Sequence, residues 1–232
     1  MSSSASIPEH IGIIMDGNRR WAKQKDLATI EGHRAGYEAL KRVAEYALDL
    51  GVKEMSVFAF STENWKRSQE EVDGLLDLFR WVMESQIEEL HEKNIRVRIV
   101  GSRQGVPKDL IASFAAAEDK TKDNDRGTLN VLFNYGGRSD ITEAVKNIVA
   151  NDDLSAEDVN EQLISDNLAT AGMRDLDLLI RTTEYRLSGF LAWESVYAEI
   201  YFQPDVTWPD FDSVELDKAI EFYSNRHRRF GA

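Results

Sequence analysis

The sequence contains no cysteine, and this absence removes several kinds of chemistry at once. None of the 232 residues is Cys, which excludes a disulfide framework, a Cys-ligated zinc site, an iron–sulfur cluster and a thiol nucleophile. Apolar runs are short, and none approaches the roughly 20 residues that span a bilayer. Residues 1–6 also lack the basic and apolar regions of a secretion signal. We therefore expect a cytoplasmic protein without a transmembrane segment.

Positive charge is also scarce. The chain has 28 Lys and Arg against 41 Asp and Glu, a net charge of −13. Broad nucleic-acid binding needs a basic surface that replaces the counterions of phosphate, so we expect no nucleic-acid partner. The same charge argues against electrostatic docking on anionic lipid. It leaves room for a small, local basic pocket.

The remaining composition is that of one soluble globular unit. Hydrophobic residues make up 42% and charged residues 30%, and a chain of this length buries about 70% of its unfolded surface without staples. The 14 Gly and 4 Pro lie at junctions between apolar segments, and no repeat or linker interrupts them. We predict a single domain over residues 1–232, with residues 1–6 disordered.

Short apolar runs alternate with longer amphipathic segments along the chain. Strands are expected at His10–Met15, Met55–Phe60, Ile95–Val100, Thr128–Phe133, Leu176–Ile180 and Glu199–Phe202. Helices are expected at His33–Leu50, from a Ser68/Glu71 capping box to Leu90, after Pro107, and at Ser139–Ala150, Ala156–Leu168 and Pro209–Arg229. This order predicts an α/β fold whose parallel sheet carries helices on its faces.

Open parallel sheets bind ligands at the carboxyl ends of their strands. The first such end carries Asp16-Gly17-Asn18-Arg19-Arg20-Trp21. Gly17 allows close backbone approach, the following helix start favours an anion, and the arginines suit phosphate. Asp16 offers a hard oxygen that could hold Mg²⁺ against that phosphate. The alternative is an Asp-Gly turn followed by surface arginines.

Two further strand ends carry cations beside hydroxyl groups. The loop at residues 61–67 reads Ser-Thr-Glu-Asn-Trp-Lys-Arg, and taken alone it fits a polar helix cap with Trp65 in the core. The loop at residues 181–189 places two arginines around hydroxyls and a glycine, which describes an anion pocket better than a charged turn. The sequence therefore predicts several phosphate-suited loops at one sheet edge.

Other signals are more ambiguous. No G-x-x-x-x-G-K-[ST] motif is present, so the site is not a P-loop. The glycine-bearing strand end at residues 134–138 also fits a plain strand-to-helix turn. His33 is either a polar residue near a helix start or a proton or phosphate partner near neutral pH.

These loops resemble the cis-prenyltransferases of the undecaprenyl diphosphate synthase type. The similarity runs from Ile7 to Gly231 and is carried by HIGIIMDGNRRWAK (10–23), GHRAG (32–36), FAFSTENWKR (58–67), NYGGR (134–138), RTTEYRLSGFLAW (181–193), YAEIYF (197–202), WPDF (208–211) and RHRRFG (226–231). The resemblance implies a six-stranded, mostly parallel sheet with surrounding helices and an apolar tunnel. It also implies a homodimer.

The resemblance implies an activity as well. Such an enzyme extends an allylic diphosphate, usually farnesyl diphosphate, with successive isopentenyl diphosphates and makes a cis double bond at each addition. The product is a medium- or long-chain polyprenyl diphosphate, here expected to be undecaprenyl diphosphate, a lipid carrier for cell-wall glycans. Mg²⁺ is the implied cofactor. Transient membrane contact could serve product release.

The resemblance also implies roles for individual residues. Asp16 and Asn64 are the expected catalytic residues, Asp16 with Mg²⁺ at the allylic diphosphate and Asn64 in proton removal. The allylic diphosphate is assigned to Gly17, Asn18, Arg19, Arg20 and His33, and Trp21 is a further expected substrate-binding residue. Isopentenyl diphosphate is assigned to Arg181, Arg186 and Ser188. Ser61, Glu63, Trp65 and Arg67, close to Asn64 in the chain, are also expected to bind substrate. Glu199 is expected to join Asp16 in the metal site.

Several positions depart from the common form of the family. Arg19 replaces a glycine, Thr29 an arginine and Glu194 a glutamine, while the loop from Arg181 to Arg186 is one residue shorter. Two alternatives therefore remain. One is a non-catalytic subunit that supports a partner synthase, and the other is an enzyme that makes a short product or joins prenyl units differently.

Overall fold

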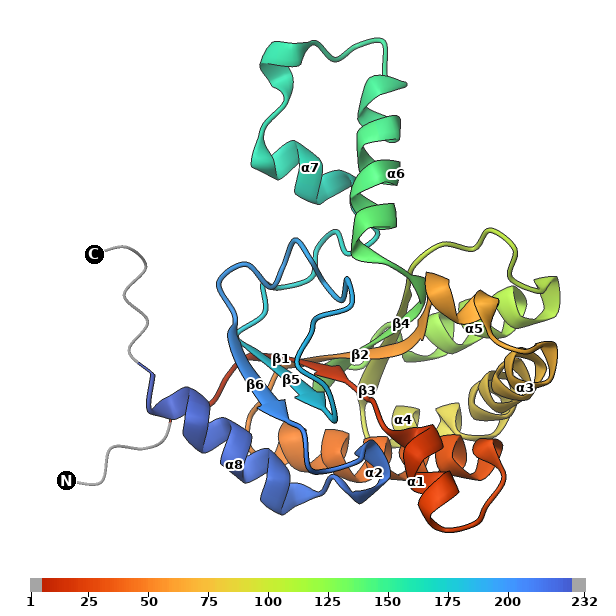
Figure 1. The fold of residues 1–232 in the computed structure, drawn as a ribbon. Coiled ribbons are helices and arrows are strands. Elements are labelled where there is room, and N and C mark those ends of the chain that lie inside the picture. Colours follow the sequence, from red (N-terminus) through yellow and green to blue (C-terminus); the bar gives the residue numbers. More distant parts are fainter. Residues whose placement is uncertain (1–5, 227–232) are drawn as a thin grey trace.

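Six strands form one sheet in the order β3-β4-β2-β1-β5-β6 (Figure 1). The computed structural model describes residues 6–226; residues 1–5, which fall in the segment expected to be disordered, and residues 227–232 lie outside this description. The strands are β1 (His10–Ile14), β2 (Glu54–Ser61), β3 (Ile95–Val100), β4 (Gly127–Tyr135), β5 (Leu178–Thr182) and β6 (Glu199–Gln203). Every neighbouring pair is parallel, so the predicted mostly parallel six-stranded sheet is confirmed.

Alternation along the central strands explains why both sheet faces are covered. Ile11 and Ile13 of β1 point into the larger core with Leu178 and Ile180 of β5. The residues between them, such as Leu179, pack in a smaller cluster on the other face. Because successive side chains of a strand point to opposite faces, these strands carry apolar residues on both faces rather than alternating apolar with polar residues.

Helices cover the sheet face that carries the larger core, whereas the smaller cluster is completed by non-helical residues such as Leu176, Phe190 and Leu191. The helices are α1 (Asn18–Gln24), α2 (Thr29–Asp49), α3 (Gln69–Ser85), α4 (Ile87–Glu92), α5 (Lys108–Thr121), α6 (Gly137–Val149), α7 (Glu161–Asn167) and α8 (Ser213–Ser224). The larger core gathers side chains from α2, α3, α5 and α8. Figure 1 shows α6 and α7 projecting away from the sheet.

The expected helices exist, but several of their boundaries were wrong. The helix expected from Ser68 to Leu90 is divided at Gln86, which ends α3 and begins α4. The segment expected as Ala156–Leu168 forms a 3₁₀ turn and then α7, because Asn160 Oδ1 accepts from Leu163 N at 2.9 Å and starts a new helix. In the last segment Asp212 caps α8, so that helix begins at Ser213 rather than Pro209.

Other local predictions are met more closely. The Ser68 hydroxyl accepts from Glu71 N at 3.4 Å and begins α3 as expected, although the Glu71 side chain turns to Arg67 instead of completing a capping box. The long helix α2 starts at Thr29, four residues before the expected His33, and ends before Gly51. Gly51 has φ +103°, a left-handed conformation that suits a helix end.

The topology brings the predicted loops to one edge. β1 lies between β2 and β5, and Ile14 pairs with Arg181 across the β1–β5 ladder. The segments that follow β1, β2, β4 and β5 therefore leave the sheet at the same side. No helix within residues 6–226 is long and apolar enough to cross a membrane.

Candidate active site

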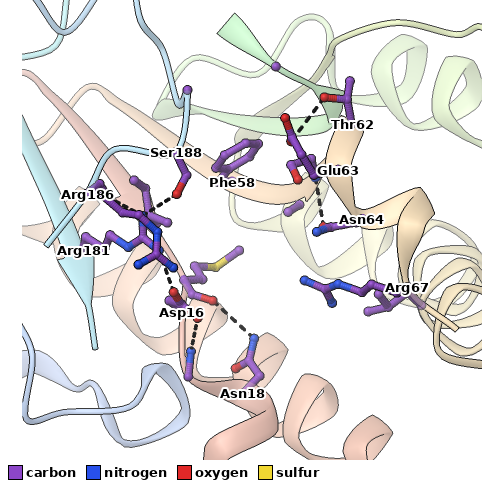
Figure 2. A pocket seen from close by; sticks show the side chains of 18 of the residues that line it. Asp16, Asn18, Phe58, Thr62, Glu63, Asn64, Arg67, Arg181, Arg186 and Ser188 are labelled. Carbon is purple, nitrogen blue, oxygen red and sulfur yellow. Dashed lines mark hydrogen bonds and ion pairs between the residues drawn. The ribbon is translucent and has the colours of Figure 1, made fainter. Parts of the chain in front are cut away.

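A cavity of about 1050 Å³ opens at the carboxyl edge of the sheet (Figure 2). It gathers the predicted site residues Asp16, Gly17, Asn18, Arg19, Arg20, His33, Ser61, Glu63, Asn64, Arg67, Arg181, Arg186 and Ser188. These residues come from the ends of β1, β2 and β5 and from α2. Residues separated by more than 160 positions in the sequence thus line the same cavity.

Several contacts fix Asp16 in the loop after β1. Its Oδ1 accepts from Gly17 N at 2.8 Å, and its Oδ2 accepts from Arg181 Nη2 at 2.7 Å. The Thr182 hydroxyl donates to the Asp16 carbonyl at 2.6 Å. Gly17 has φ +103°, and an added Cβ would lie 2.7 Å from Thr183 Cγ2. The turn after β1 therefore requires glycine to bring the Asp16 loop against the β5 loop.

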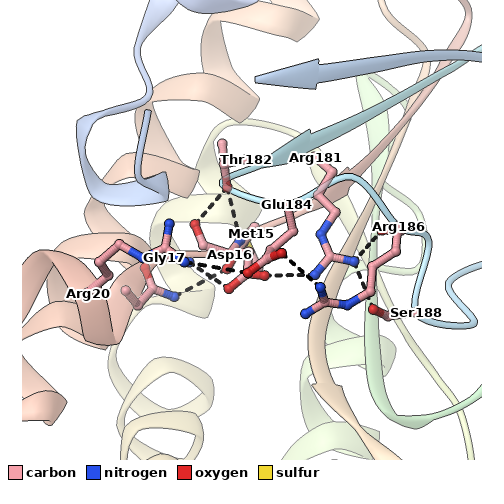
Figure 3. A network of polar contacts seen from close by, with 10 residues as sticks. Met15, Asp16, Gly17, Arg20, Arg181, Thr182, Glu184, Arg186 and Ser188 are labelled. Carbon is pink, nitrogen blue, oxygen red and sulfur yellow. Dashed lines mark hydrogen bonds and ion pairs between the residues drawn. The ribbon is translucent and has the colours of Figure 1, made fainter. Parts of the chain in front are cut away.

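Arg181 is the most buried cation of the site (Figure 3). Only 4% of its side chain is exposed. Besides Asp16, it contacts the Arg186 carbonyl and donates to Ser188 Oγ at 2.8 Å. The guanidinium fork thus holds the 186–188 loop in a closed form around the end of β5.

Glu184 lies between Arg20 and Arg186, two exposed arginines of the site (Figure 3). Its carboxylate accepts from Arg186 Nη1 at 2.8 Å and lies 3.5 Å from Arg20 Nη2. Arg20 belongs to the Asp16 loop and Arg186 to the β5 loop, so one acidic side chain connects both. Sequence reasoning named these arginines and missed their shared counter-ion.

A second carboxylate, Glu71 of α3, balances another group of cations. It lies 2.8 Å from Arg67, 3.6 Å from Arg19 and 3.9 Å from His33 Nε2. Burial, together with the charges of Arg67 and Arg19, lowers the pKa of His33 to about 4. His33 is therefore neutral at physiological pH, and its buried Nε2 has no hydrogen-bond partner within residues 6–226. A neutral imidazole can offer one donor and one acceptor to a ligand.

The loop after β2 is preorganised by its own polar groups. Asn64 Oδ1 accepts from Ser61 N at 3.0 Å as part of a reciprocal capping box. Both residues border the cavity, as do Glu63 and Arg67. Because the oxygen of Asn64 is engaged by the backbone, its amide N–H₂ is the group left for a ligand.

Three predicted site residues do not line this cavity. Trp65 packs on Phe60 at a ring distance of 5.0 Å and donates to Asn134 Oδ1 at 2.8 Å, as the alternative interpretation of its loop expected. Trp21 turns away and donates to Asp210 Oδ1 at 2.8 Å. Glu199 begins β6 and pairs in register with Leu178, which places it at the amino edge of the sheet rather than beside Asp16.

The cavity also contains residues that the sequence did not assign. Gly136, Gly137, Arg138 and Ser139, at the start of α6, form part of its wall. Gly137 N donates to the Gly189 carbonyl at 2.8 Å, so this wall and the Ser188 loop are joined directly. The glycine pair after the β4 strand was the available signal.

An apolar cavity of about 100 Å³ adjoins the polar one. Met15, Asn18, His33, Ala59 and Leu75 line both. Its remaining lining comes mainly from α2, α3 and the sheet, so an apolar space adjoins the site. The arrangement presents charge at the mouth and hydrocarbon behind it.

The residues present fit a magnesium site completed by substrate. Within residues 6–226, no three His, Cys, Asp or Glu side chains come together as a metal cage. Mg²⁺ commonly takes one or two carboxylates, several waters and the phosphate oxygens of a substrate. Asp16 provides such a carboxylate at the cavity wall.

Together, a polar cavity rich in arginine and an adjoining apolar cavity define an α/β site for a substrate with an anionic head and a hydrocarbon tail. The family model described as "Putative undecaprenyl diphosphate synthase" matches residues 14–231. The chain therefore belongs to the undecaprenyl diphosphate synthase family of prenyltransferases.

Individual relatives agree with this assignment. The isoprenyl transferase of Agrobacterium fabrum is 46% identical over 100% of this chain and 95% of its own length. A Vibrio parahaemolyticus relative, named ditrans,polycis-undecaprenyl-diphosphate synthase ((2E,6E)-farnesyl-diphosphate specific), is 44% identical over 98% of this chain and 92% of its own.

Solved structures show the same fold. Lavandulyl diphosphate synthase from Lavandula x intermedia, in complex with dimethylallyl diphosphate, matches with a TM-score of 0.93 and 33% identity, covering 97% of this chain and 99% of its own. A "probable undecaprenyl diphosphate synthase" from Campylobacter jejuni matches with a TM-score of 0.82 and 30% identity, covering 98% and 100%.

Proposed function

We propose that the protein extends farnesyl diphosphate by sequential condensation with isopentenyl diphosphate and produces a medium- or long-chain polyprenyl diphosphate, most simply undecaprenyl diphosphate. The observation that carries this proposal is the meeting of two arginine-bearing loops at the Asp16–Arg181 pair, within one cavity that adjoins an apolar one. Two diphosphates bound there would lie side by side.

The Asp16 loop is the proposed allylic subsite. Gly17 brings the backbone close to the ligand, and Arg19 and Arg20 supply charge that neutralises a diphosphate leaving group. His33, kept neutral by its lowered pKa, can donate to a phosphate oxygen without adding a further charge. The hydrocarbon chain would then extend into the apolar cavity between α2 and α3.

The β5 loop is the proposed subsite for isopentenyl diphosphate. Arg186 is 63% exposed and can leave Glu184 to bind a phosphate, whereas Arg181 is held in place by Asp16 and Ser188. Arg181 thus orients the subsite, and Arg186 supplies the mobile charge. Although the loop from Arg181 to Arg186 is one residue shorter than the common form, Arg181, Arg186 and Ser188 all line the cavity.

Asp16 would hold Mg²⁺, which when bound supplies charge neutralisation that makes the allylic diphosphate a better leaving group. In the proposed reaction the allylic C–O bond breaks, the double bond of isopentenyl diphosphate attacks the allylic carbon, and a proton leaves the new chain. An amide does not accept a proton at neutral pH. Asn64 therefore orients the isopentenyl group by its N–H₂ while a diphosphate oxygen accepts the proton.

A homodimer is part of the proposal. Val196 and Tyr197, just before the edge strand β6, are 67% and 72% exposed, which is high for apolar side chains. Glu199 follows this segment and lies away from Asp16 of its own chain. Its proposed role in the metal site would therefore depend on a second copy of the chain. Light scattering of the purified protein tests this point, since a monomer at working concentration would contradict both statements.

Cytoplasmic location and transient membrane contact complete the proposal. The cysteine-free composition supports a reducing compartment. Leu27 and Trp81, which border an outer groove between α2 and α3, are 45% and 43% exposed and could meet a lipid surface during release of the product.

Product length separates the main proposal from a second candidate. An apolar cavity of about 100 Å³ is small for a long chain, and the likeness to lavandulyl diphosphate synthase favours a short-chain or differently joined product as the alternative. A long product requires α2 and α3 to move apart as the chain grows.

One experiment addresses both candidates. The protein is incubated with farnesyl diphosphate, labelled isopentenyl diphosphate and Mg²⁺, and the dephosphorylated products are separated by chain length. A long cis-polyprenyl product supports the main proposal, and a product of one or two additions supports the second. If a control synthase is active and this protein incorporates no label, the chain is a non-catalytic subunit. Parallel titration with isopentenyl diphosphate then shows whether the β5 loop still binds it.

A further inference from the structure

Two buried carboxyl groups lie behind the wall of the diphosphate cavity. Asp140 and Glu194 are 8% and 6% exposed, and neither lines the cavity itself. Asp140 is in the first turn of α6, directly after Gly137, Arg138 and Ser139 of the wall. Glu194 follows the Ser188 loop along the chain. The pair therefore sits behind both elements that close this side of the site.

Each carboxyl has one bonded oxygen and one orphaned oxygen. Ala169 N donates to Asp140 Oδ1 at 2.7 Å, and the next residue, Thr170, bonds Glu194 Oε1 through its hydroxyl. Asp140 Oδ2 and Glu194 Oε2 are buried without a hydrogen-bond partner in the described part of the chain. Leaving one such oxygen ionised and unpaired is costly, and two are worse.

A single proton removes one of these two buried charges. On either carboxyl it turns an acceptor into a donor, and only one carboxylate then remains ionised. Two buried carboxyls that consecutive residues tie together cannot both ionise cheaply, because like charges oppose each other in a poorly solvated site.

The charged and polar groups described below do not neutralise the two buried carboxyls. Asp175, before β5, adds a further negative charge near Glu194. Tyr135, at the end of β4, is a neutral donor near Asp140, but its hydroxyl makes no hydrogen bond to that carboxyl, and its influence on the Asp140 pKa is outweighed by burial. Arg98 of β3, the cation bonded to this segment, donates to the Ala171 carbonyl at 3.0 Å. Burial accordingly raises the pKa of both carboxyls, and the Asp140 charge raises that of Glu194 further.

We propose that Asp140 and Glu194 retain one proton between them at neutral pH, and that this protonated pair is a positioning element for the isopentenyl diphosphate side of the cavity. The positioning route is short. Gly137 N, three residues before Asp140, donates to the Gly189 carbonyl beside Ser188. Glu194 anchors the other end of that segment, its carbonyl accepting from Leu176 N at 3.0 Å. Loss of the proton would make the two carboxylates repel each other and would separate the start of α6 from the segment that Glu194 anchors. The positioning role, unlike the retained proton, rests on the proposed function.

Retention of a proton by the Asp140–Glu194 pair predicts how the stability of the protein changes with pH. A carboxyl whose folded pKa is raised binds more proton in the folded state than in the unfolded state, so stability falls as pH rises from the ordinary carboxyl pKa to the raised one. The unfolding equilibrium constant should increase by up to about tenfold per pH unit in that window. Glu194→Gln removes the titration while keeping the shape and supplying a permanent N–H donor.

Denaturant unfolding from pH 5 to pH 9 tests this prediction without requiring turnover. Glu143→Gln, on the exposed face of α6, is the matched control and should follow the unaltered protein. Glu194→Gln should show a flatter profile and overtake the unaltered protein as pH rises. Parallel profiles for all three proteins would overturn the proton assignment. A second measurement, useful if one variant folds poorly, is the infrared band of a buried protonated carboxyl. The band should be present in the unaltered protein and absent from Glu194→Gln or Asp140→Asn. Absence of the band from the unaltered protein would also overturn the proton assignment.

The positioning role is tested by binding. Titration with isopentenyl diphosphate at pH 7 and pH 9 should show weakening for the unaltered protein and for Glu143→Gln, and little change for Glu194→Gln. Equal weakening in all three proteins would overturn the positioning role even if the proton is present. No binding by any protein would count against the proposed function, while the unfolding profiles would still decide the proton.

Discussion

Arg181 Nη2 donates to Asp16 Oδ2 at 2.7 Å, so the buried cation of one proposed subsite neutralises the carboxylate of the other. The pair joins the loops after β1 and β5, which are adjacent in the sheet but 165 positions apart in sequence. Asp16 is only partly buried, whereas Arg181 is almost fully enclosed. The contact therefore orders the arginine while leaving the acid accessible to a ligand.

Asp16 substitutions should separate the metal role from the structural one. Asp16→Ala should abolish turnover, and Asp16→Asn, which keeps an oxygen for Arg181, should still lose at least about 10²-fold in kcat because the charge is gone. Both proteins should retain native circular dichroism, with Asp16→Asn the more stable. Initial rates of label incorporation measure the effect, and near-normal activity in Asp16→Asn would contradict the metal assignment.

Arg181 and Arg186 should respond differently to lysine. Arg181→Lys cannot reach Asp16, Ser188 and the Arg186 carbonyl together, so it should lower the free energy of unfolding by about 1–3 kcal/mol and weaken isopentenyl diphosphate binding. Arg186→Lys, at an exposed position, should weaken binding with little change in stability, within about 0.5 kcal/mol. Titration and thermal unfolding of both variants distinguish these roles. Equal stability losses would show that Arg181 is not the structural member.

His33 should make the protein less stable in mild acid. Its folded pKa of about 4 lies below the ordinary 6.5, so the unfolded state binds the proton first and stability is lost as pH falls from 6.5 toward 4. The full loss from this one group is on the order of 3 kcal/mol. His33→Gln should flatten that part of the profile, and a proton NMR titration of His33 should show no charging above pH 5. A midpoint near 6.5 would contradict the burial argument.

Sequence patterns predicted the sheet and the location of the site because both depend on local signals. A run such as His10–Ile14, buried at every position, is recognisable as a central parallel strand. The carboxyl ends of such strands share one edge, so the strand pattern alone predicts that Asp16 and Arg181 lie at the same edge. The family resemblance then placed individual roles on these loops.

Pairings between side chains were not predictable in the same way. Glu71 and Glu184 gained their importance from arginines distant in the sequence, and no local pattern marks such a counter-ion. The loop sequence alone favoured the core for Trp65, whereas the family resemblance assigned it to the site, and its packing on Phe60 agrees with the core. Helix breaks such as Gln86 depended on how α3 and α4 pack rather than on a glycine or proline.

Gly32 of α2 and Gly74 of α3 test how closely α2 must approach the Asp16 loop. A Cβ at Gly32 would lie 2.1 Å from the Asn18 carbonyl oxygen, which is backbone and cannot turn aside, whereas a Cβ at Gly74 of α3 would lie 3.5 Å from Ile30 Cδ1. Gly32→Ala should therefore displace the Asn18 turn, lowering both stability and allylic diphosphate affinity. Gly74→Ala should stabilise α3 by about 0.5–1 kcal/mol with unchanged affinity. Thermal unfolding and farnesyl diphosphate titration measure both effects. A Gly32→Ala protein that behaves like Gly74→Ala would show that the loop does not depend on this close approach.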